Sequence, residues 1–257
     1  MVTDSSVEVL ASVRAHGSRA GICADFDGTL AAIVDEPADA RPLDGVPELL
    51  DELSRRYGVV AVLSGRPVAF LQALLPGSVV LSGLYGLEVV RGGVRVDHPL
   101  GGMWREVVDD VVTVAHASGP DGMRVEPKGL SLTLHYRGRP DLEPQVLAFA
   151  ERQAARSGLT VRRARMSVEL HPPIDADKGT ALRELTEGLS AVCFLGDDRG
   201  DLPAFAALDE LAASGVATVR VAVRSDESPA ELLDAADMVV DGPEGARALL
   251  GELARDE

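Results

Sequence analysis

The segment DFDGTL, residues 25–30, follows the apolar run ICA at 22–24 and places two carboxylates one residue apart. Side chains at i and i+2 of an extended chain point to the same side, so Asp25 and Asp27 are predicted to lie together just past a strand over residues 20–25. Two close carboxylates repel each other unless a cation or a shared proton lies between them. A hard divalent ion with oxygen ligands, Mg²⁺ first, meets this need. The alternative is a pair of turn-forming aspartates that cap the next helix.

Further polar groups occur where other apolar runs end or where a helical pattern begins. One set follows the run at 59–63, one residue opens a helical pattern at 178, and another set follows the run at 191–195. Open parallel α/β sheets bind ligands at the carboxyl ends of their strands, so these groups are predicted to join the aspartate pair in one site. They are Ser64, Arg66, Lys178, Asp197, Asp198 and Asp201.

Predicted strands and helices alternate in two stretches of the chain, up to about residue 81 and again from about residue 178. Such alternation is typical of a parallel sheet with helices on both faces, so the predicted fold class is α/β with a Rossmann-like core. After the first strand, we predict helices at 47–57, 67–75, 178–187, 201–208 and from 243, and strands at 59–63, 79–81, 191–195, 217–223 and 237–240.

A different pattern separates the two stretches. A hairpin over 88–96 turns at Gly92-Gly93, and the elements that follow lack the strand–helix alternation. They are helices at 103–117 and 142–156 and strands at 123–126, 130–136, 160–164 and 167–170. The sequence therefore predicts a core domain over 1–102 and 173–257, interrupted by a small α+β cap domain over 103–172.

The net charge and the cysteines of the chain indicate which binding partners and which cellular compartment to expect. The net charge of −16 leaves no basic stripe for a nucleic-acid backbone and disfavours an anionic membrane surface. The sequence shows no transmembrane run and no signal peptide. Cys23 and Cys193 lie in predicted neighbouring strands, so we expect buried free thiols and a cytoplasmic protein. The oligomeric state stays open.

In their order along the chain, the motifs resemble those of the haloacid dehalogenase superfamily of phosphoryl-transfer enzymes, from about residue 20 to about residue 245. The resemblance implies that Asp25 is a nucleophile that forms an aspartyl-phosphate. It implies that Asp27 protonates the leaving oxygen, later activates water, and binds Mg²⁺ through its backbone carbonyl. Asp25 and Asp197 would supply the carboxylate ligands of the metal.

The remaining groups have expected roles around the phosphoryl group. Lys178 is expected to reach that group and the nucleophile, because a lysine in a first helical turn otherwise opposes the helix dipole; a solvated lysine is the alternative. Ser64 is expected to donate a hydrogen bond to the phosphoryl group, and Arg66 to bind a phosphate or carboxylates of the cap. Asp198 and Asp201 are expected either to orient metal-bound waters or to cap a helix.

Longer segments resemble the trehalose-6-phosphate phosphatases within that superfamily. The first motif continues as DFDGTLAAIV at 25–34, and LYGLE at 84–88, EPKGLS at 126–131 and VELHP at 168–172 resemble elements before, in and after the cap. The resemblance implies that sugar hydroxyls are held by Glu126, Lys128, Arg137 and Glu169. Arg66 and Glu88 are the other candidate substrate-binding residues.

Strand alternation gives independent support, since it brings Glu126, Lys128 and Glu169 towards one surface, although a solvent-exposed salt-bridged face is the alternative. The chain departs from the family after its second acidic pair, where it reads RGDL at 199–202. Because of this departure, a phosphatase for another glycosyl or pseudo-disaccharide phosphate is the alternative function. A sugar phosphomutase and a non-catalytic sugar-phosphate sensor are lower-ranked alternatives.

Overall fold

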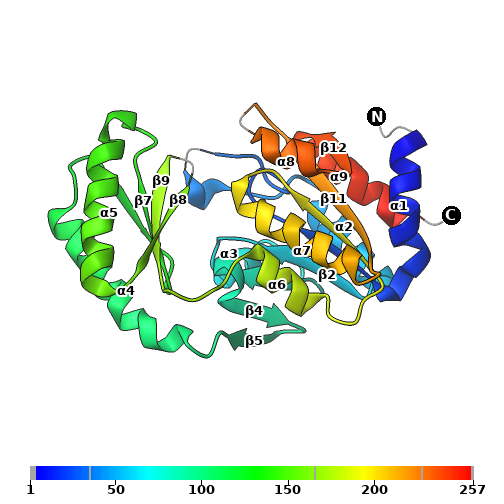
Figure 1. Ribbon diagram of the computed structural model, residues 1–257, viewed down its shortest axis with the longest axis horizontal. Coiled ribbons are helices and arrows are strands. Elements are labelled where there is room, and N and C mark those ends of the chain that lie inside the picture. The colour runs from blue at the N-terminus through cyan, green and yellow to red at the C-terminus, as the bar shows by residue number, and fades with distance from the viewer. Residues whose placement is uncertain (1–3, 35, 165, 227, 256–257) are drawn as a thin grey trace. The chain divides into compact units, whose positions relative to one another are not determined.

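The computed structural model describes residues 4–34, 36–164, 166–226 and 228–255 (Figure 1). It divides into two compact units, a core unit of Met1–Val96 with Ala176–Glu257 and an inserted unit of Asp97–Asp175. The inserted unit begins at Asp97 rather than Met103 and ends at Asp175 rather than Pro172. The reason is that the chain leaves the large sheet at the end of β5 (Val94–Asp97) and rejoins the core just before helix α6 (Lys178–Leu185).

The core unit is built on one sheet with the strand order β12-β11-β10-β1-β2-β3-β4-β5, and β12 to β3 run parallel. The parallel strands are β1 (Ala20–Ala24), β2 (Val59–Leu63), β3 (Val80–Gly83), β10 (Ala191–Gly196), β11 (Ala217–Arg224) and β12 (Met238–Asp241). The chain moves outward from β1 to β3 and returns to the other side of β1 at β10. The strand order therefore reverses between β1 and β10, which is where open parallel sheets bind ligands.

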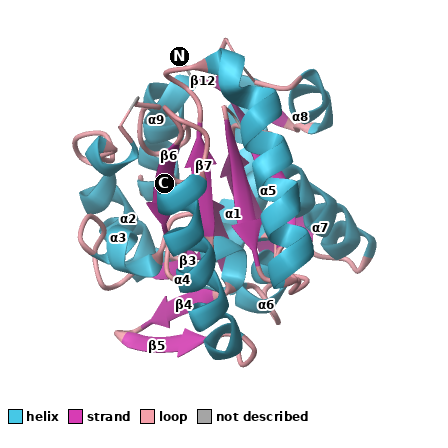
Figure 2. Cartoon of the chain, turned by 90° about the vertical axis from the view of Figure 1, so that its left-hand side faces the viewer, coloured by secondary structure: helices cyan, strands magenta, loops and turns pink. Residues whose placement is uncertain are grey.

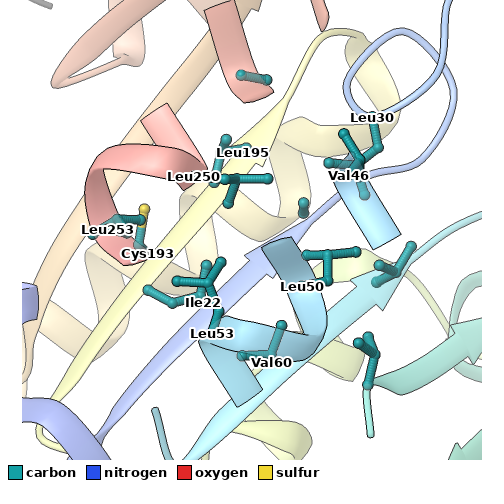
Figure 3. Packing of buried hydrophobic residues seen from close by; sticks show 14 of the residues in the cluster. Ile22, Leu30, Val46, Leu50, Leu53, Val60, Cys193, Leu195, Leu250 and Leu253 are labelled. Carbon is teal, nitrogen blue, oxygen red and sulfur yellow. The ribbon is translucent and has the colours of Figure 1, made fainter. Parts of the chain in front are cut away.

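Helices cover both faces of this sheet, as predicted for an α/β core. One face packs against α1 (Asp4–His16), α2 (Val46–Arg56), α3 (Val68–Gln72) and α9 (Gly242–Ala254). Figure 3 shows Leu53 of α2 and Leu253 of α9 beside the strand residues Ile22 and Cys193. The other face packs against α6, α7 (Leu202–Ala213) and α8 (Ala230–Ala235). Burial on both faces explains why the strands read as continuous apolar runs.

The two cysteines confirm the predicted burial. Cys23 and Cys193 are both buried free thiols, and each lies in a different hydrophobic cluster. They lie on opposite faces because Cys23 pairs in register with Phe194, so Cys193 is one residue out of phase.

The predicted hairpin is confirmed and forms the edge of the large sheet. Strand β4 (Glu88–Arg91) runs antiparallel to β3, and β5 is the outermost strand (Figure 2). The turn between β4 and β5 needs φ above zero, and Gly92 and Gly93 have φ of 56° and 77°.

The inserted unit is an antiparallel sheet with helices on one face. Its strands are β6 (Arg124–Pro127), β7 (Leu132–His135), β9 (Ser167–His171) and β8 (Thr160–Ala164), in that order across the sheet. Helices α4 (Gly101–Ser118) and α5 (Glu143–Ser157) pack on inward-facing residues such as Leu134 and Val168. The alternate residues of the same strands therefore line the face without helices.

Helices α3 and α7 differ most from their predicted ranges, and α1 and α8 have no counterpart among the predicted ranges. Helix α3 ends at Gln72 rather than Leu75, and α7 continues beyond residue 208 to Ala213. Helix α8 spans only six residues, too few to show a helical period in the sequence. Among the described helices, none combines the length and the apolar composition that a membrane crossing requires.

Helices α6 and α7 lie side by side and approach closely at Gly179, in the first turn of α6 (Figure 1). A Cβ atom built on Gly179 would lie 2.4 Å from the backbone oxygen of Pro203. Because the obstacle is backbone, a side chain at this position cannot be accommodated by a rotamer change. The glycine therefore allows the helix that carries Lys178 to pack against α7.

We expect Gly179→Ala to destabilise the protein by about 1–3 kcal/mol, the usual cost of overpacking a filled interior. The control is Gly251→Ala in α9, where a Cβ would meet nothing within 4 Å. That change should be neutral or should stabilise by about 0.5–1 kcal/mol, because alanine favours a helix over glycine. Urea denaturation midpoints measure both, and equal midpoints for the two variants would contradict the steric argument.

Candidate functional site

The two central strands end side by side and each is followed by an aspartate. Ala24 on β1 pairs with Leu195 on β10, and the backbone N–H of Asp25 donates to the carbonyl oxygen of Leu195 at 2.8 Å. Asp197 follows β10 directly. The predicted position of both residues at the carboxyl edge of the sheet is confirmed.

A buried lysine connects the segments that meet at this edge. The Lys178 ammonium lies 2.7 Å from Oδ1 of Asp25 and 2.6 Å from Oδ1 of Asp201. All three side chains are at most 6% exposed. The alternative of a solvated lysine is therefore wrong, and the cation at the start of α6 is neutralised by carboxylates rather than by water.

Asp201 uses both of its oxygens inside the protein. Its Oδ1 accepts from Lys178, and its Oδ2 accepts from the backbone N–H of Asp197 at 2.8 Å and of Asp198 at 3.1 Å. The Asp198 carboxylate accepts from the N–H of Gly200 at 2.7 Å. Both aspartates thus cap the short helix over Arg199–Asp201, which is the capping alternative that the sequence left open.

The neighbouring Arg199 forms an ion pair with Glu231 at 2.8 Å and is exposed. The sequence departure at 199–202 therefore adds a surface ion pair to α8 and leaves the buried Asp201 in place.

Asp25, Asp197 and Asp201 form an acidic group that fits a metal ion. One carboxylate oxygen from each lies within 4.8 Å of the others. With Lys178 included, these groups carry a net charge of about −2 when ionised, a surplus that one divalent cation would balance. A donor set of oxygens alone favours a hard ion such as Mg²⁺. The chemistry of this set therefore fits the predicted cofactor.

Burial is the largest single influence on the pKa of each of these groups. Burial raises the pKa of Asp25 well above its usual value, and Lys178 opposes that rise. Burial, together with Asp201 and Asp198, raises the pKa of Asp197 to about 8. Burial alone would lower the pKa of Lys178, but Asp201 and Asp25 outweigh it and hold that pKa well above its ordinary value. The cluster holds more buried carboxylate than its single ammonium can balance.

Gly28 and Thr29 bring the DFDGTL loop against Asp197. Gly28 has φ +84°, and a Cβ built on it would lie 2.1 Å from Oδ2 of Asp197. The hydroxyl of Thr29 is buried and lies 3.4 Å from Oδ1 of the same aspartate. The sequence marked Gly28 only as a turn and gave Thr29 no role, because the approach of Asp197 is a contact between distant segments.

Asp27 takes a different cation from Asp25. The Nε and Nη2 atoms of Arg66 donate to its two oxygens at 2.8 and 2.7 Å. The sequence predicted that Asp25 and Asp27 share one point, and that Arg66 binds phosphate or cap carboxylates. In the structure Lys178 holds the first aspartate and Arg66 holds the second.

Ser64 and Glu88 both bond to backbone groups near the end of β2. Ser64 is buried, and its hydroxyl accepts from the backbone N–H of Arg66 at 3.1 Å. Glu88 is buried and accepts from the backbone N–H of Val68 at 2.9 Å and from Arg95 at 2.6 Å. Glu88 thus provides the hydrogen-bond partner of a backbone N–H at the start of α3 and forms an ion pair with Arg95 within the core unit.

The inserted unit has its own polar row on the face without helices. Strand register places Thr133 opposite Glu126 on one side and opposite Glu169 on the other, and Arg162 lies opposite Glu169. Residues directly opposite each other in a sheet share a face. The row therefore contains two of the predicted sugar-binding residues, and Thr133 and Arg162 in addition.

Contacts within this face hold the carboxylates in place. Glu126 lies 2.7 Å from Nε2 of His135, and the Ser131 hydroxyl donates to Glu169 at 2.7 Å. Glu169 is 2% exposed, and Thr133 is buried with a hydroxyl that has no hydrogen-bond partner among the described residues. An unpaired buried hydroxyl is costly, so it marks a position suited to a polar ligand.

Lys128 and Arg137, the other predicted sugar-binding residues, are half-buried residues of the same unit, in the turns after β6 and β7. Sequence reasoning missed Thr133 and Arg162 in this face. The alternation of β7, in which Leu132 and Leu134 are apolar and Thr133 is polar, was the signal that could have found Thr133.

Comparison with known proteins identifies the family. The family model described as trehalose-phosphatase matches residues 23–237. The trehalose-phosphate phosphatase of Mycobacterium ulcerans (strain Agy99) is 31% identical over 249 residues, which cover 92% of this chain and 62% of the relative. The trehalose-6-phosphate phosphatase of Escherichia coli (strain K12) is 29% identical over 201 residues, which cover 75% of this chain and 74% of the relative. The chain spans about half to two thirds of the length of mycobacterial relatives of this kind.

A solved structure has the same fold. The C-terminal domain of the Candida albicans trehalose-6-phosphate phosphatase superposes with a TM-score of 0.79 at 24% identity, covering 98% of each chain. The family match spans the motifs of the core unit from Asp25 to Asp201 and the whole of the inserted unit. The chain belongs to the trehalose-phosphatase family.

Proposed function

We propose that this protein is a Mg²⁺-dependent phosphatase that hydrolyses trehalose 6-phosphate to trehalose and phosphate through an aspartyl-phosphate on Asp25. The observation that carries the proposal is the buried cluster in which Lys178 bridges Asp25 and Asp201 beside Asp197. The relatives named above as trehalose-phosphate phosphatases support the choice of substrate.

The core residues divide the first half of the reaction among them. A carboxylate oxygen of Asp25 attacks phosphorus, and the bond between phosphorus and the sugar oxygen breaks. Asp27 gives a proton to that leaving oxygen. Lys178 holds the nucleophile in place and offsets negative charge, while Ser64 donates to a phosphoryl oxygen. Mg²⁺, held by Asp25, Asp197 and the backbone carbonyl of Asp27, would neutralise the charge of the phosphoryl oxygens.

We assign sugar recognition to the helix-free face of the inserted unit. Its polar row offers carboxylates and a hydroxyl, which are suitable partners for sugar hydroxyls. Glu126, Lys128, Arg137 and Glu169 are the residues proposed to bind the sugar. Glu88 and Arg66 belong to the core unit and are not part of this face; Glu88 bonds to the start of α3 and Arg66 to Asp27.

Asp25→Asn should abolish turnover, because an amide neither attacks phosphorus nor binds Mg²⁺ well. We expect a loss of several orders of magnitude in kcat, measured as phosphate release from trehalose 6-phosphate. Asp39→Asn, at an exposed aspartate of the core unit, is the control and should retain full rate. Activity of Asp25→Asn within tenfold of the unchanged protein would exclude Asp25 as the nucleophile.

Chelation by EDTA should remove activity and added Mg²⁺ should restore it. Asp197→Ala should raise the Mg²⁺ concentration needed for half-maximal rate by at least about tenfold, since one carboxylate ligand is lost. Binding without turnover gives a second readout: Mg²⁺ should raise the Tm of the unchanged protein more than that of Asp197→Ala. A chelated enzyme that keeps its full rate would rule out the metal.

Glu169→Gln tests sugar recognition. Loss of one charged hydrogen bond to a sugar hydroxyl should lower kcat/KM for trehalose 6-phosphate by about tenfold to a hundredfold. Hydrolysis of p-nitrophenyl phosphate, which has no sugar, should change less than about twofold. Glu106→Gln, at an exposed position of α4, removes the same charge as a control. Equal losses on both substrates would mean that Glu169 supports the fold and not sugar binding. Phosphate release from a panel of glycosyl phosphates separately tests the choice of sugar.

A further inference from the structure

Asp27 is fixed by a two-point contact. The Nε of Arg66 donates to Oδ2 at 2.8 Å and its Nη2 donates to Oδ1 at 2.7 Å. A fork of this kind fixes both the position of the carboxylate and the rotation of its plane. A carboxylate can accept about four hydrogen bonds, so each oxygen keeps a site free after the fork has formed.

Arg66 is itself held from several sides. Its Nη1 donates to the backbone oxygen of Pro37 at 2.8 Å, and its guanidinium lies over the ring of Phe70 at 4.7 Å from the centroid. Phe70 in turn packs edge to face against Phe26, with ring centroids 5.8 Å apart. The Arg66 side chain is 11% exposed. Phe26 lies between Asp25 and Asp27 in the sequence. The residues that hold Arg66 in place, and through it Asp27, therefore include one from the segment that carries the nucleophile.

We propose that Arg66 is a positioning residue for the second half-reaction, in which it holds Asp27 to take a proton from the water that hydrolyses the aspartyl-phosphate. This inference rests on the proposed function. In that step the water oxygen bonds to phosphorus while the bond between phosphorus and the Asp25 oxygen breaks. One water proton passes to Asp27, inorganic phosphate leaves, and Asp25 regains its carboxylate. Asp27 gives the proton to the leaving oxygen of the next substrate.

The two half-reactions can be separated with p-nitrophenyl phosphate. Its leaving group departs as a stable phenolate and needs no proton, so formation of the aspartyl-phosphate does not require Asp27. For this substrate kcat/KM reports the steps up to phosphoryl transfer, whereas kcat includes hydrolysis of the intermediate. A defect in positioning Asp27 as a base must therefore lower kcat and leave kcat/KM unchanged.

We expect Arg66→Gln to lower kcat for p-nitrophenyl phosphate by about tenfold to a hundredfold, which is part of the usual effect of a general base. Its kcat/KM should stay within about twofold, and rapid mixing should show a burst of about one equivalent of p-nitrophenolate. The retained kcat/KM also demonstrates a folded site. If Arg66→Gln does not fold, Arg66→Lys keeps the charge without the fork and should show the same split to a smaller degree.

Three controls isolate the contact with Asp27. Arg41→Gln removes an exposed arginine that donates to the carbonyls of Ala38 and Ala40 in the same loop, and it should leave both constants unchanged. Asp27→Asn should produce the same split and burst. Adding Arg66→Gln to Asp27→Asn should cause no further loss, since residues that act as one unit are not additive.

Equal losses of kcat and kcat/KM without a burst would overturn the proposal and leave Arg66 as a support of the loop. Additive losses in the double variant would overturn it as well. Failure of the proposed function looks different: the unchanged protein would not hydrolyse trehalose 6-phosphate, or Asp25→Asn would stay active.

Discussion

The buried ammonium of Lys178 between Asp25 and Asp201 is the contact on which the site depends. It joins the end of β1, the start of α6 and the short helix after β10, three segments far apart in the chain. Buried ion pairs add little net stability, because the cost of removing both charges from water offsets their attraction. Removal of one partner is a different matter, since it leaves an uncompensated buried charge and costs about 3–5 kcal/mol. The cluster therefore fixes geometry more than it adds stability.

The structure gives each aspartate of the DFDGTL motif its own cation. Asp25 is buried and pairs with an ammonium, which is a compact charge. Asp27 is more exposed and pairs with a guanidinium, whose planar fork also fixes the rotation of the carboxylate. Two close carboxylates that shared one cation would compete for it. In the proposed mechanism, separate partners allow Asp25 to act as a nucleophile and Asp27 to exchange protons with water.

The polar face of the inserted unit follows from the way its helices cover only one side of its sheet. Two helices cover one side of a four-stranded sheet, so each strand needs apolar residues only at alternate positions. The positions between them can carry polar side chains, and strand register aligns Glu126, Thr133 and Glu169 across three strands. A shift of register by one residue would move every one of these side chains to the helix-covered side.

The sequence by itself determined the class of the fold, the order of most of its elements and the segments that meet at the site. Apolar runs, glycines and the spacing of DFDGTL, Lys178 and Asp197 are local features, and local features specify strands, turns and motif residues. The sequence could not decide that Arg66 holds Asp27, that Asp201 accepts from Lys178, or that Thr133 lies opposite Glu169 in the polar row. Only the tertiary structure decided these partners, because each contact joins residues that the chain order keeps apart, and periodicity does not specify which distant side chains will meet.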